Sequence, residues 1–375
     1  MALVACALAV SQIASGEPSV PAAQGARGPG ARLLQAPLSR KVSLQVDPPA
    51  ASSANLAYAA MRRRFAFADG RYGHAATHSY AHLWPLSQAI SASLVFGSLP
   101  GRTAAAARAD ALRTVGALPH YRVGQGYESI TMPPRNRGGN LYYDDNNWIA
   151  LDLLAVYRLT GSQAYLRRAE GVFRFLVSGW DTNASDVCPG GIYWARPPLP
   201  QIRTTVSTAN AALVALRLYQ ATGRRDYLTW AQRMYGWVTR CLAGPNGLYF
   251  DHLDSLGNVS KQEWTYNQGA MIAADVLLAR ATGQQSYLDQ ARATAKAALA
   301  RYGASGYKGE PPIFVAIFFG DLNLLRQAVP LRSYRPALRD YLRHHVTLRS
   351  NGRFGSSLVF QAAAVQLYSL AAAPS

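Results

Sequence analysis

The chain has 375 residues and a formal charge of +18 at pH 7, because 38 Lys and Arg residues outnumber 20 Asp and Glu residues. Its hydrophobic fraction of 49% is that of a globular protein and excludes an intrinsically disordered chain. The basic residues are scattered and no nucleic-acid-binding motif accompanies them, so we expect no nucleic-acid partner. The charge is compatible with a weak attraction to an anionic envelope or glycolipid.

The N-terminal 50 residues differ in composition from the rest of the chain. Residues 1–16 are apolar, rich in small side chains and uncharged, like the hydrophobic part of a secretory signal. Residues 17–50 are rich in Pro, Gly, Ala and Arg without a sustained period, which predicts a linker or disordered arm. No later segment has the roughly 18 apolar residues that span a bilayer. We therefore predict a single domain over 51–375, in a protein that is secreted or associated with the cell envelope.

The chain has three cysteines. Cys6 lies in the predicted leader, while Cys188 and Cys241 lie in loop-like segments and would be an even pair in a mature exported protein. Either a disulfide joins them or both are buried thiols. The Cys and His spacings match no zinc pattern, and we expect neither a metal nor another cofactor.

Helical patterns cover most of the chain after the arm. One spans 54–65, and a second opens at Leu83 with Pro85 near its first turn, where a missing N–H costs little. Residues 119–147 contain Pro-Pro and Gly-Gly breakers and are predicted to be a loop. Further helical patterns span 104–118, 314–327, 335–344 and 356–371. No alternating run rich in Val and Ile predicts a sheet.

Three segments in the middle of the chain share one pattern. Each has an apolar helix, Thr-Gly, Tyr-Leu, and an Ala four residues after the Tyr, and the copies are about 60 residues apart; they span 153–169, 213–231 and 273–291. Gly suits the left-handed residue that ends a helix, and residues four apart lie on one face of the next helix. A repeat of two helices in about 60 residues predicts an array of helical hairpins.

The chain after the arm has room for five to six hairpins. Six hairpins can close into a ring, and the predicted fold is therefore all-α, an (α/α)6 toroid. An open solenoid is the structural alternative. We favour the closed ring because segments that combine polar and aromatic residues recur at matching places in the units, as if they converge on one site.

The first of these segments is Tyr142-Tyr143-Asp144-Asp145-Asn146-Asn147-Trp148. Flat rings stack on pyranose faces, amides hold hydroxyls, and a carboxylate pair can cut a glycosidic bond. Helix capping is the alternative role of Asp144 and Asp145, but one Asp would suffice for it. Two adjacent carboxylates repel and raise the pKa of one of them, which is useful if one must stay protonated. This stretch alone leaves catalysis and capping open.

Other acidic residues are less distinctive. Asp251 and Asp254, with His252 between them, are the next closest pair, and Asp321 is placed in a loop. A further set sits inside helical patterns and is expected on solvated faces: Asp110, Asp152, Glu170, Asp226, Asp275, Asp289 and Asp340.

Three more segments combine rings and polar side chains near predicted helix starts. They span 188–194, 207–210 and 264–269. Any one of them is most simply a turn with a partly buried aromatic residue, but together with 142–148 they favour a carbohydrate groove.

Asp144-Asp145-Asn146-Asn147-Trp148, followed by Leu153-Leu154 and Thr160-Gly161, resembles the signature of glycoside hydrolase family 76, the endo-α-1,6-mannanases. Trp264-Thr265-Tyr266-Asn267-Gln268-Gly269 is similar to that family's second motif, and Gly190-Gly191-Ile192-Tyr193-Trp194 and Leu83-Trp84-Pro85 also resemble its pattern. The resemblance covers roughly residues 54–370. It implies an (α/α)6 fold and retaining cleavage of α-1,6-mannan.

The resemblance also implies roles for individual residues. Asp144 would be the nucleophile and Asp145 the general acid/base, with carboxyl groups about 5–5.5 Å apart. The implied partner is α-mannan or a mannan-containing glycan or glycolipid. We expect the protein itself to be a monomer. The implied substrate-binding residues are Trp84, Tyr143, Asn146, Asn147, Trp148, Tyr193, Trp194, Asn210, Trp264, Tyr266, Asn267 and Gln268.

One departure from the family pattern concerns the outer subsites rather than the carboxylate pair. Glu310-Pro311-Pro312 separates Lys308-Gly309 from Ile313-Phe314-Val315, and Ala316 stands where an Arg is expected. Three alternatives are a mannan transglycosylase, a non-catalytic mannan-binding protein and another (α/α)6 enzyme such as a sugar epimerase. An epimerase would use His as acid/base, and none of the seven His residues lies in the four ring-and-polar segments.

Overall fold

A computed structural model describes residues 47–74, 80–133 and 136–374. Gln45–Ser375 forms one compact unit. Its first helix, α1 (Pro48–Phe65), begins three residues before the predicted domain start at residue 51. The predicted leader at 1–16 and the arm as far as residue 46 lie outside the described residues. None of the described helices is long and apolar enough to cross a membrane.

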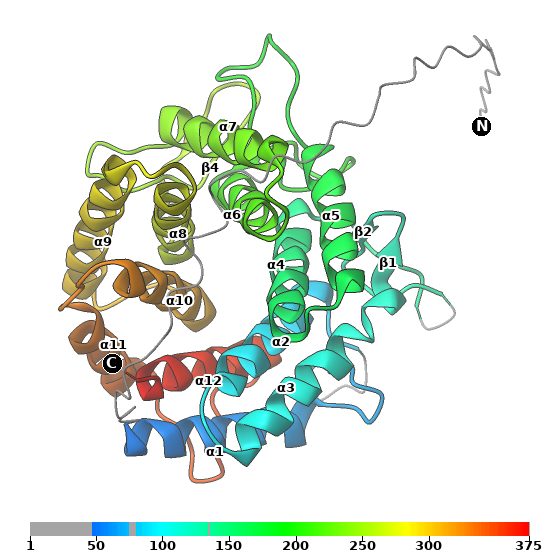
Figure 1. The fold of residues 1–375 in the computed structure, drawn as a ribbon, viewed down its shortest axis with the longest axis vertical. Coiled ribbons are helices and arrows are strands. Elements are labelled where there is room, and N and C mark those ends of the chain that lie inside the picture. Colours follow the sequence, from blue (N-terminus) through cyan, green and yellow to red (C-terminus); the bar gives the residue numbers. More distant parts are fainter. Residues whose placement is uncertain (1–46, 75–79, 134–135, 375) are drawn as a thin grey trace, which may run out of the picture. The chain divides into compact units, whose positions relative to one another are not determined.

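Six helices of this unit form an inner ring in which each helix contacts the next (Figure 1). They are α2 (Leu83–Gly97), α4 (Tyr143–Thr160), α6 (Thr205–Thr222), α8 (Thr265–Thr282), α10 (Pro312–Ala328) and α12 (Leu358–Ala372). Contacts between α12 and α2 close the ring. This confirms the predicted (α/α)6 toroid and excludes the open solenoid.

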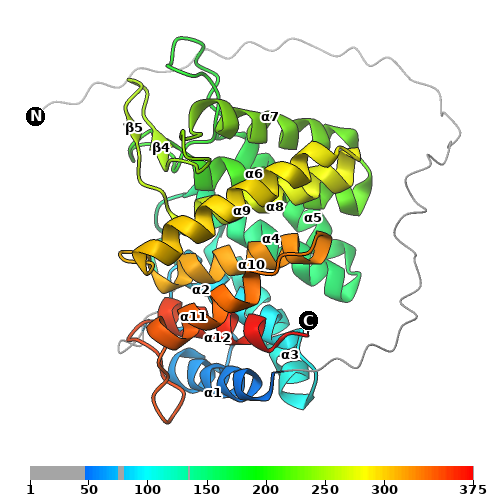
Figure 2. The same cartoon turned by 90° about the vertical axis from the view of Figure 1, so that its left-hand side faces the viewer.

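The other helices pack outside the ring (Figures 1 and 2). Besides α1, they are α3 (Arg102–Val115), α5 (Gln163–Val177), α7 (Arg225–Cys241), α9 (Gln285–Ser305) and α11 (Tyr334–His345), and a short 3-10 helix spans Leu118–Tyr121. Inner helices such as α8 are apolar on nearly all sides and are buried along most of their length. Outer helices bury one stripe, which in α7 consists of Tyr227, Ala231, Met234, Trp237 and Val238.

The Thr-Gly turns of the repeat end helices as predicted. Gly161, Gly223 and Gly283 follow α4, α6 and α8 in the left-handed conformation, with φ of 70°, 72° and 76°. The preceding Thr donates its hydroxyl to a carbonyl four residues upstream and accepts the N–H two residues downstream in all three copies. A Cβ at any of these glycines would meet nothing within 4 Å, so conformation rather than space requires Gly.

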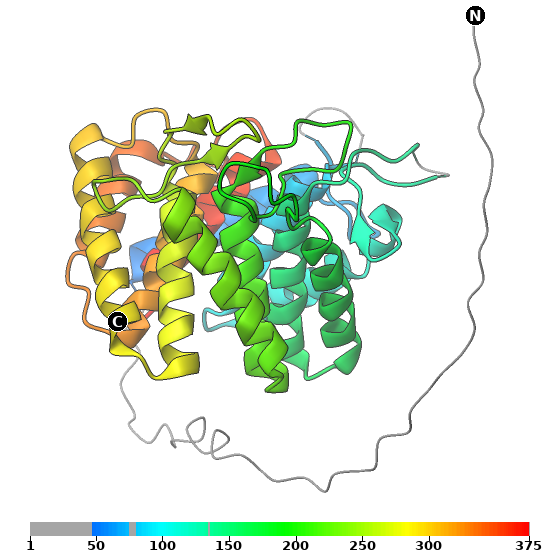
Figure 3. The ribbon, with the colours of Figure 1, turned by 90° about the horizontal axis from the view of Figure 1, so that it is seen from above.

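The loops before the inner helices carry short strands and gather at one end of the helical array (Figure 3). The strands are β1 (Arg122–Val123), β2 (Gly126–Tyr127), β3 (Arg203–Thr204), β4 (His252–Leu253) and β5 (Val259–Ser260). β1 and β2 pair antiparallel, and β3, β4 and β5 form a second antiparallel sheet in that order. Strands of two residues are too short to leave an alternating pattern in the sequence.

A disulfide joins Cys188 and Cys241, whose Cα atoms are 6.2 Å apart. It ties the loop between α5 and α6 to the last residue of α7. The pairing is therefore confirmed, and the alternative of two buried thiols is wrong.

Several segments predicted to be loops or turns are partly or wholly helical. α4 starts at Tyr143, so the predicted loop over 119–147 ends earlier and both carboxylates belong to the first turn of a helix. Residues 207–210 lie inside α6, and α8 begins at Thr265. Asp321 lies in α10 rather than in a loop. The helices extend further toward the loops because their first turns are packed inside the ring.

The expectation that helical acidic residues face solvent is wrong for three of them. Asp110, Asp152 and Asp275 are 9%, 2% and 0% exposed. Asp110 accepts a hydrogen bond from the Tyr58 hydroxyl at 2.6 Å, and Asp152 accepts one from the Ser91 hydroxyl at 2.7 Å. Asp152 and Asp275 belong to inner helices, which have hardly any solvated face.

Candidate active site

Asp144 and Asp145 lie in the first turn of α4, at the end of the ring that carries the loops. Both side chains are half-buried. Consecutive helical residues are only about 100° apart around the axis, whereas in a strand they would point to opposite faces. The N-terminus of the helix also favours negative charge through its dipole. The first turn of α4 therefore allows the two neighbouring carboxyl groups to point toward the same side of the helix.

The two carboxyl groups have unequal surroundings. Asp144 Oδ2 accepts a hydrogen bond from the Trp194 indole N–H at 3.0 Å, and its Oδ1 accepts the Asp145 N–H at 2.9 Å. Within the described part of the chain, the Asp145 carboxyl group makes no hydrogen bond. The two neighbouring carboxyl groups therefore differ in their hydrogen bonding.

The pKa values follow from these surroundings. Burial raises the pKa of Asp144 to about 7, although its two hydrogen bonds act in the opposite direction. Burial raises the pKa of Asp145 well above the usual range, and the charge of Asp144 raises it further. Burial thus favours the protonated form of both carboxyl groups, and the charge of Asp144 adds to this effect at Asp145.

A third carboxylate, Asp251, belongs to the same electrostatic group, because its charge adds to the raised pKa of Asp144. It precedes β4, and its oxygens lie 2.8 Å from His252 Nδ1 and 3.2 Å from Asn267 Nδ2. Sequence reasoning did not include Asp251 in the site, although the Asp-His-x-Asp cluster was the signal that could have found it.

Aromatic rings from α2 and from the start of α8 gather around Phe314 of α10. The Phe314 ring centroid lies 4.1 Å from that of Tyr266, 5.5 Å from that of Trp264 and 6.1 Å from that of Trp84. The structure thus brings three predicted substrate-binding residues together around one that was not predicted. We call these four residues the aromatic cluster.

The aromatic cluster lies beside the carboxylates. The charges of Asp251 and Asp144, together with burial, raise the pKa of the Tyr266 hydroxyl well above its usual range. Glu310 contributes to the same shift and also caps α8, since it accepts hydrogen bonds from the Thr265 N–H at 3.1 Å and hydroxyl at 2.7 Å. Tyr266 therefore links the aromatic cluster to the acidic residues.

Two predicted sugar-binding amides are fully used within the protein. Asn146 accepts the Tyr127 N–H at 2.8 Å and donates to the Tyr127 carbonyl at 2.9 Å. Gln268 makes the same pair of bonds to Tyr249, both at 2.8 Å. In both cases the tyrosine is 19 residues upstream. These amides hold the loops in front of α4 and α8 in place.

Three other predicted amides each keep one atom without a hydrogen-bond partner among the described residues. These buried atoms are Asn147 Oδ1, Asn210 Nδ2 and Asn267 Oδ1. They come from α4, α6 and α8. Such atoms are able to bind a polar group that enters between the inner helices.

The remaining predicted residues differ in their placement. The Tyr143 ring packs on Phe175 at 4.8 Å and is buried in the core. The Tyr193 hydroxyl donates to Asp181. Trp148 is half-buried, one turn after Asp144. Trp148 thus differs from Tyr143 and Tyr193, because no ring contact or hydrogen bond among the described residues holds its side chain.

Within the described ranges, no group of three or more His, Cys, Asp or Glu side chains is arranged to hold a metal ion.

The sequence profile of glycosyl hydrolase family 76 matches residues 56–347, well over half of the chain. The chain belongs to glycosyl hydrolase family 76. Membership agrees with the motifs around Asp144 and Trp264 and with the closed ring of hairpins.

Fungal relatives of this family-76 protein match over a limited stretch. The mannan endo-1,6-alpha-mannosidase DCW1 of Candida glabrata is 31% identical over 144 residues, which are 34% of this chain and 30% of that protein. The matched part thus spans about a third of the relative's length.

Solved structures share the fold over most of the chain. The family-76 mannosidase Bt3792 of Bacteroides thetaiotaomicron superposes with a TM-score of 0.75 and 22% identity, over 86% of this chain and 97% of that one. An inactive variant of the α-1,6-mannanase GH76A of Salegentibacter, in complex with α-1,6-mannotriose, gives a TM-score of 0.69 and 20% identity over 86% and 99%.

Proposed function

We propose that this family-76 protein is a retaining endo-α-1,6-mannanase. The observation that carries the proposal is the unequal pair in the first turn of α4, where Asp144 accepts two hydrogen bonds and Asp145, which accepts none among the described residues, has a raised pKa. Two comparisons support it. The matched fungal relative is named a mannan endo-1,6-alpha-mannosidase. The inactive Salegentibacter variant that holds α-1,6-mannotriose has two consecutive aspartates replaced by asparagine.

In the first step, the Asp144 carboxylate attacks the anomeric carbon while Asp145 gives its proton to the departing glycosidic oxygen. The bond to the leaving sugar breaks and a mannosyl ester forms on Asp144. Asp145, now ionised, takes a proton from water as the water oxygen attacks the same carbon. The ester bond breaks, Asp144 is regenerated, and two inversions retain the α configuration.

The Trp194 indole N–H holds Asp144 in one orientation and stabilises its charge before attack. The aromatic cluster offers flat apolar faces for sugar rings beside the carboxylates. Asp251 orients Asn267, whose free Oδ1 is an acceptor for a hydroxyl donor. These contacts assign positioning roles to residues from four different inner helices or the loops before them.

The test is incubation with linear α-1,6-mannan, with the anomers of the products followed by NMR. We expect the α-anomer first, and loss of turnover by several orders of magnitude in Asp144→Asn. Asp289→Asn, on the exposed face of α9, is the matched control and should remain fully active. Products that appear first as the β-anomer would mean inversion and rule out Asp144 as the nucleophile.

A second substrate separates the two carboxyl groups. An aryl α-mannoside with a good leaving group needs no proton from an acid, so Asp145→Asn should form the mannosyl ester normally and hydrolyse it slowly. Added azide, which needs no general base, should then restore turnover in Asp145→Asn but not in Asp144→Asn. Intact polymer with detectable binding in the wild-type protein would instead favour a mannan-binding protein or a transferase that awaits its acceptor.

We also propose that the protein works as a monomer outside the cytosol, at the cell envelope or beyond it. The Cys188–Cys241 disulfide supports this, because such bonds persist in oxidising compartments. Thiol labelling of protein isolated from its natural cell fraction, together with light scattering, tests both statements. Labelled Cys188 or a dimer mass would contradict them.

A further inference from the structure

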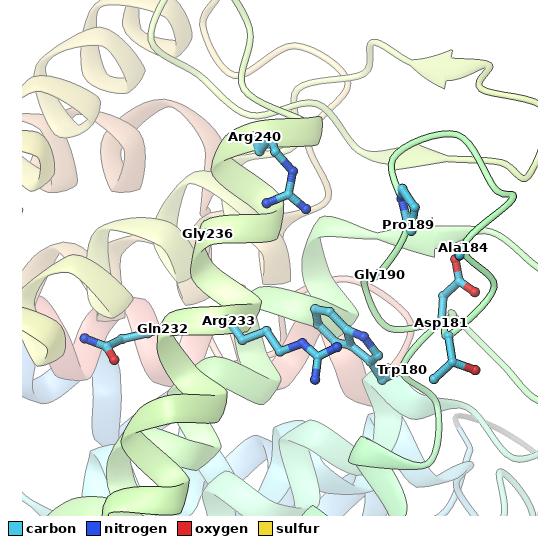
Figure 4. Close-up of a pocket in the computed structure, with 10 residues that line it drawn as sticks. Trp180, Asp181, Ala184, Pro189, Gly190, Gln232, Arg233, Gly236 and Arg240 are labelled. Carbon is cyan, nitrogen blue, oxygen red and sulfur yellow. The ribbon is translucent and has the colours of Figure 1, made fainter.

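A pocket of about 500 Å³ lies between α7 and the loop that follows α5 (Figure 4). Trp180 and Asp181 line it from the loop side, and Arg233, Gly236 and Arg240 line it from the helix. Neither the carboxylate pair nor the aromatic cluster contributes to the pocket. It is therefore a second concave site, on an outer helix of the ring.

Arg233 is fixed between two indole rings. Its guanidinium carbon lies 4.6 Å from the centroid of the Trp180 ring and 5.0 Å from that of Trp230. The two rings meet edge to face, with centroids 5.7 Å apart. A guanidinium held over aromatic faces keeps its edge N–H groups in one plane for a forked acceptor such as phosphate or carboxylate.

The positive charge of this pocket is not neutralised from within. In the described part of the chain, neither Arg233 nor Arg240 forms an ion pair. Asp181 also lines the pocket, but Arg203 donates to its Oδ2 at 2.8 Å and the Asn183 N–H donates to its Oδ1 at 2.8 Å. Because the Arg203 side chain is fully buried, that pair is closed to a ligand.

Gly236 leaves the surface of α7 between Arg233 and Arg240 without a side chain. It lies three residues after Arg233 and four before Arg240, so all three share one face of α7. A Cβ at this position would meet nothing within 4 Å, so packing does not require Gly. Gly inside a helix is less stable than Ala, because it loses more backbone freedom on folding. A ligand that lies across the helix between the arginines would explain why no side chain stands here.

We propose that this pocket binds an anionic saccharide, a sugar that carries a phosphate ester or a carboxylate. The arginines bind the anionic group. The formal charge of +18 draws such a ligand toward the protein. The proposal stands independently of the activity proposed for the carboxylate pair, since it concerns binding alone.

The test uses the full chain and four probes: mannose 6-phosphate, glucuronate, mannose and inorganic phosphate, followed by ligand-observed NMR and calorimetry at low salt. We expect a phosphate ester or a uronate to bind, and which of them binds more tightly identifies the anionic group. Arg240→Gln and Arg233→Gln should each weaken binding about tenfold or more, as for loss of a charge-assisted hydrogen bond.

Two variants keep the result interpretable if Arg233→Gln disturbs the indole pair. Gly236→Leu places a side chain between the two arginines, and its Cβ would meet nothing within 4 Å, so it should abolish binding while thermal stability is unchanged or raised. Arg225→Gln removes the same charge from an exposed position of α7 outside the pocket and should leave binding intact. Mannose that binds as tightly as the anionic sugars, or affinities unaffected by Arg240→Gln and Gly236→Leu, would overturn the proposal. Inorganic phosphate that binds as tightly as the sugar phosphate would also overturn it and leave an adventitious ion only.

Discussion

Trp194 donates its indole N–H to Asp144 Oδ2 at 3.0 Å, across 50 residues of sequence. The contact exists because the loop after α5 pairs with the start of α4, where the Tyr143 N–H donates to the Trp194 carbonyl at 2.8 Å. The indole bond lowers the pKa of Asp144 against the effect of burial, so it controls the pH at which the proposed nucleophile becomes available.

Trp194→Phe should therefore move the acid limb of the kcat/KM profile to higher pH. The nucleophile must be ionised, and loss of a hydrogen bond to a charged group is worth about 1.5–3 kcal/mol, or about 1–2 pH units. The profile is measured on an α-1,6-mannooligosaccharide between pH 4 and 9. Trp264→Phe is the control, because it alters the aromatic cluster alone and should change KM with the limb in place. An unmoved limb in Trp194→Phe would contradict the assigned role.

Asp251→Asn should move the same limb in the opposite direction. The charge of Asp251 raises the pKa of Asp144, so its removal lets the nucleophile ionise at lower pH. The expected shift is smaller, about half a unit to one unit, since no direct hydrogen bond is lost. Asp254→Asn removes an equal charge from the neighbouring turn and should leave the limb unmoved. A shift to higher pH in Asp251→Asn would show that its charge does not act on Asp144.

The ring of hairpins was predictable because its signals are local. The Gly after each Thr and the Tyr-Leu that follows are neighbours in the sequence, so the end of one helix and the start of the next can be predicted without any distant contact. The adjacency of Asp144 and Asp145 was readable for the same reason. Closure of the ring was favoured only by the recurrence of ring-and-polar segments, and contacts between α12 and α2 establish it.

The rest of the site depends on contacts between distant segments, which a local pattern does not contain. Phe314 and Asp251 join the site only because the ring places Phe314 of α10 against Tyr266 of α8 and brings the charge of Asp251, before β4, close to Asp144. Asn146 and Gln268 looked like sugar-binding amides, but their partners are backbone groups 19 residues away. Asp152 was placed on a solvated face because charge in a helix usually lies there, whereas inner helices of a closed ring have almost none.

Asn146→Ala should destabilise the fold rather than weaken substrate binding specifically. It leaves the buried N–H and carbonyl of Tyr127 without their partner, at about 1–3 kcal/mol each. We expect the free energy of unfolding in urea to fall by about 2–6 kcal/mol, and Gln268→Ala to do the same through Tyr249. Asn55→Ala, which removes an exposed amide from α1, is the control. A raised KM with unchanged unfolding would instead indicate a direct sugar contact.

Replacing Cys188 and Cys241 together by Ser should lower stability and leave the chemistry intact. The bond closes a separation of 53 residues, and the chain-entropy account gives about 4 kcal/mol for a loop of that size. Neither cysteine belongs to the carboxylate pair or the aromatic cluster. Urea unfolding with and without reductant measures the change, and kcat of the folded variant is the control. Equal midpoints for wild type and variant would show that the bond does not stabilise the fold.

Asp275 should make the protein less stable as pH rises. Its side chain is buried in α8, and burial raises its pKa from a usual value near 3.8 to about 7, against a smaller opposite effect of the Tyr235 hydroxyl. The folded state therefore keeps a proton that the unfolded chain releases. The stabilisation from this group is full below about pH 4 and is lost between pH 4 and pH 7, at about 1.4 kcal/mol per pH unit.

Asp275→Asn removes this titration and retains the shape of the side chain. The variant should match the wild type near pH 4 and exceed its unfolding free energy at pH 8 by at most about 4 kcal/mol. Chemical denaturation at a series of pH values measures the difference. Asp289→Asn, at an exposed position of α9, should follow the wild type throughout. A variant that is less stable than the wild type at pH 8 would mean that the Asp275 carboxylate is ionised and compensated in the folded protein.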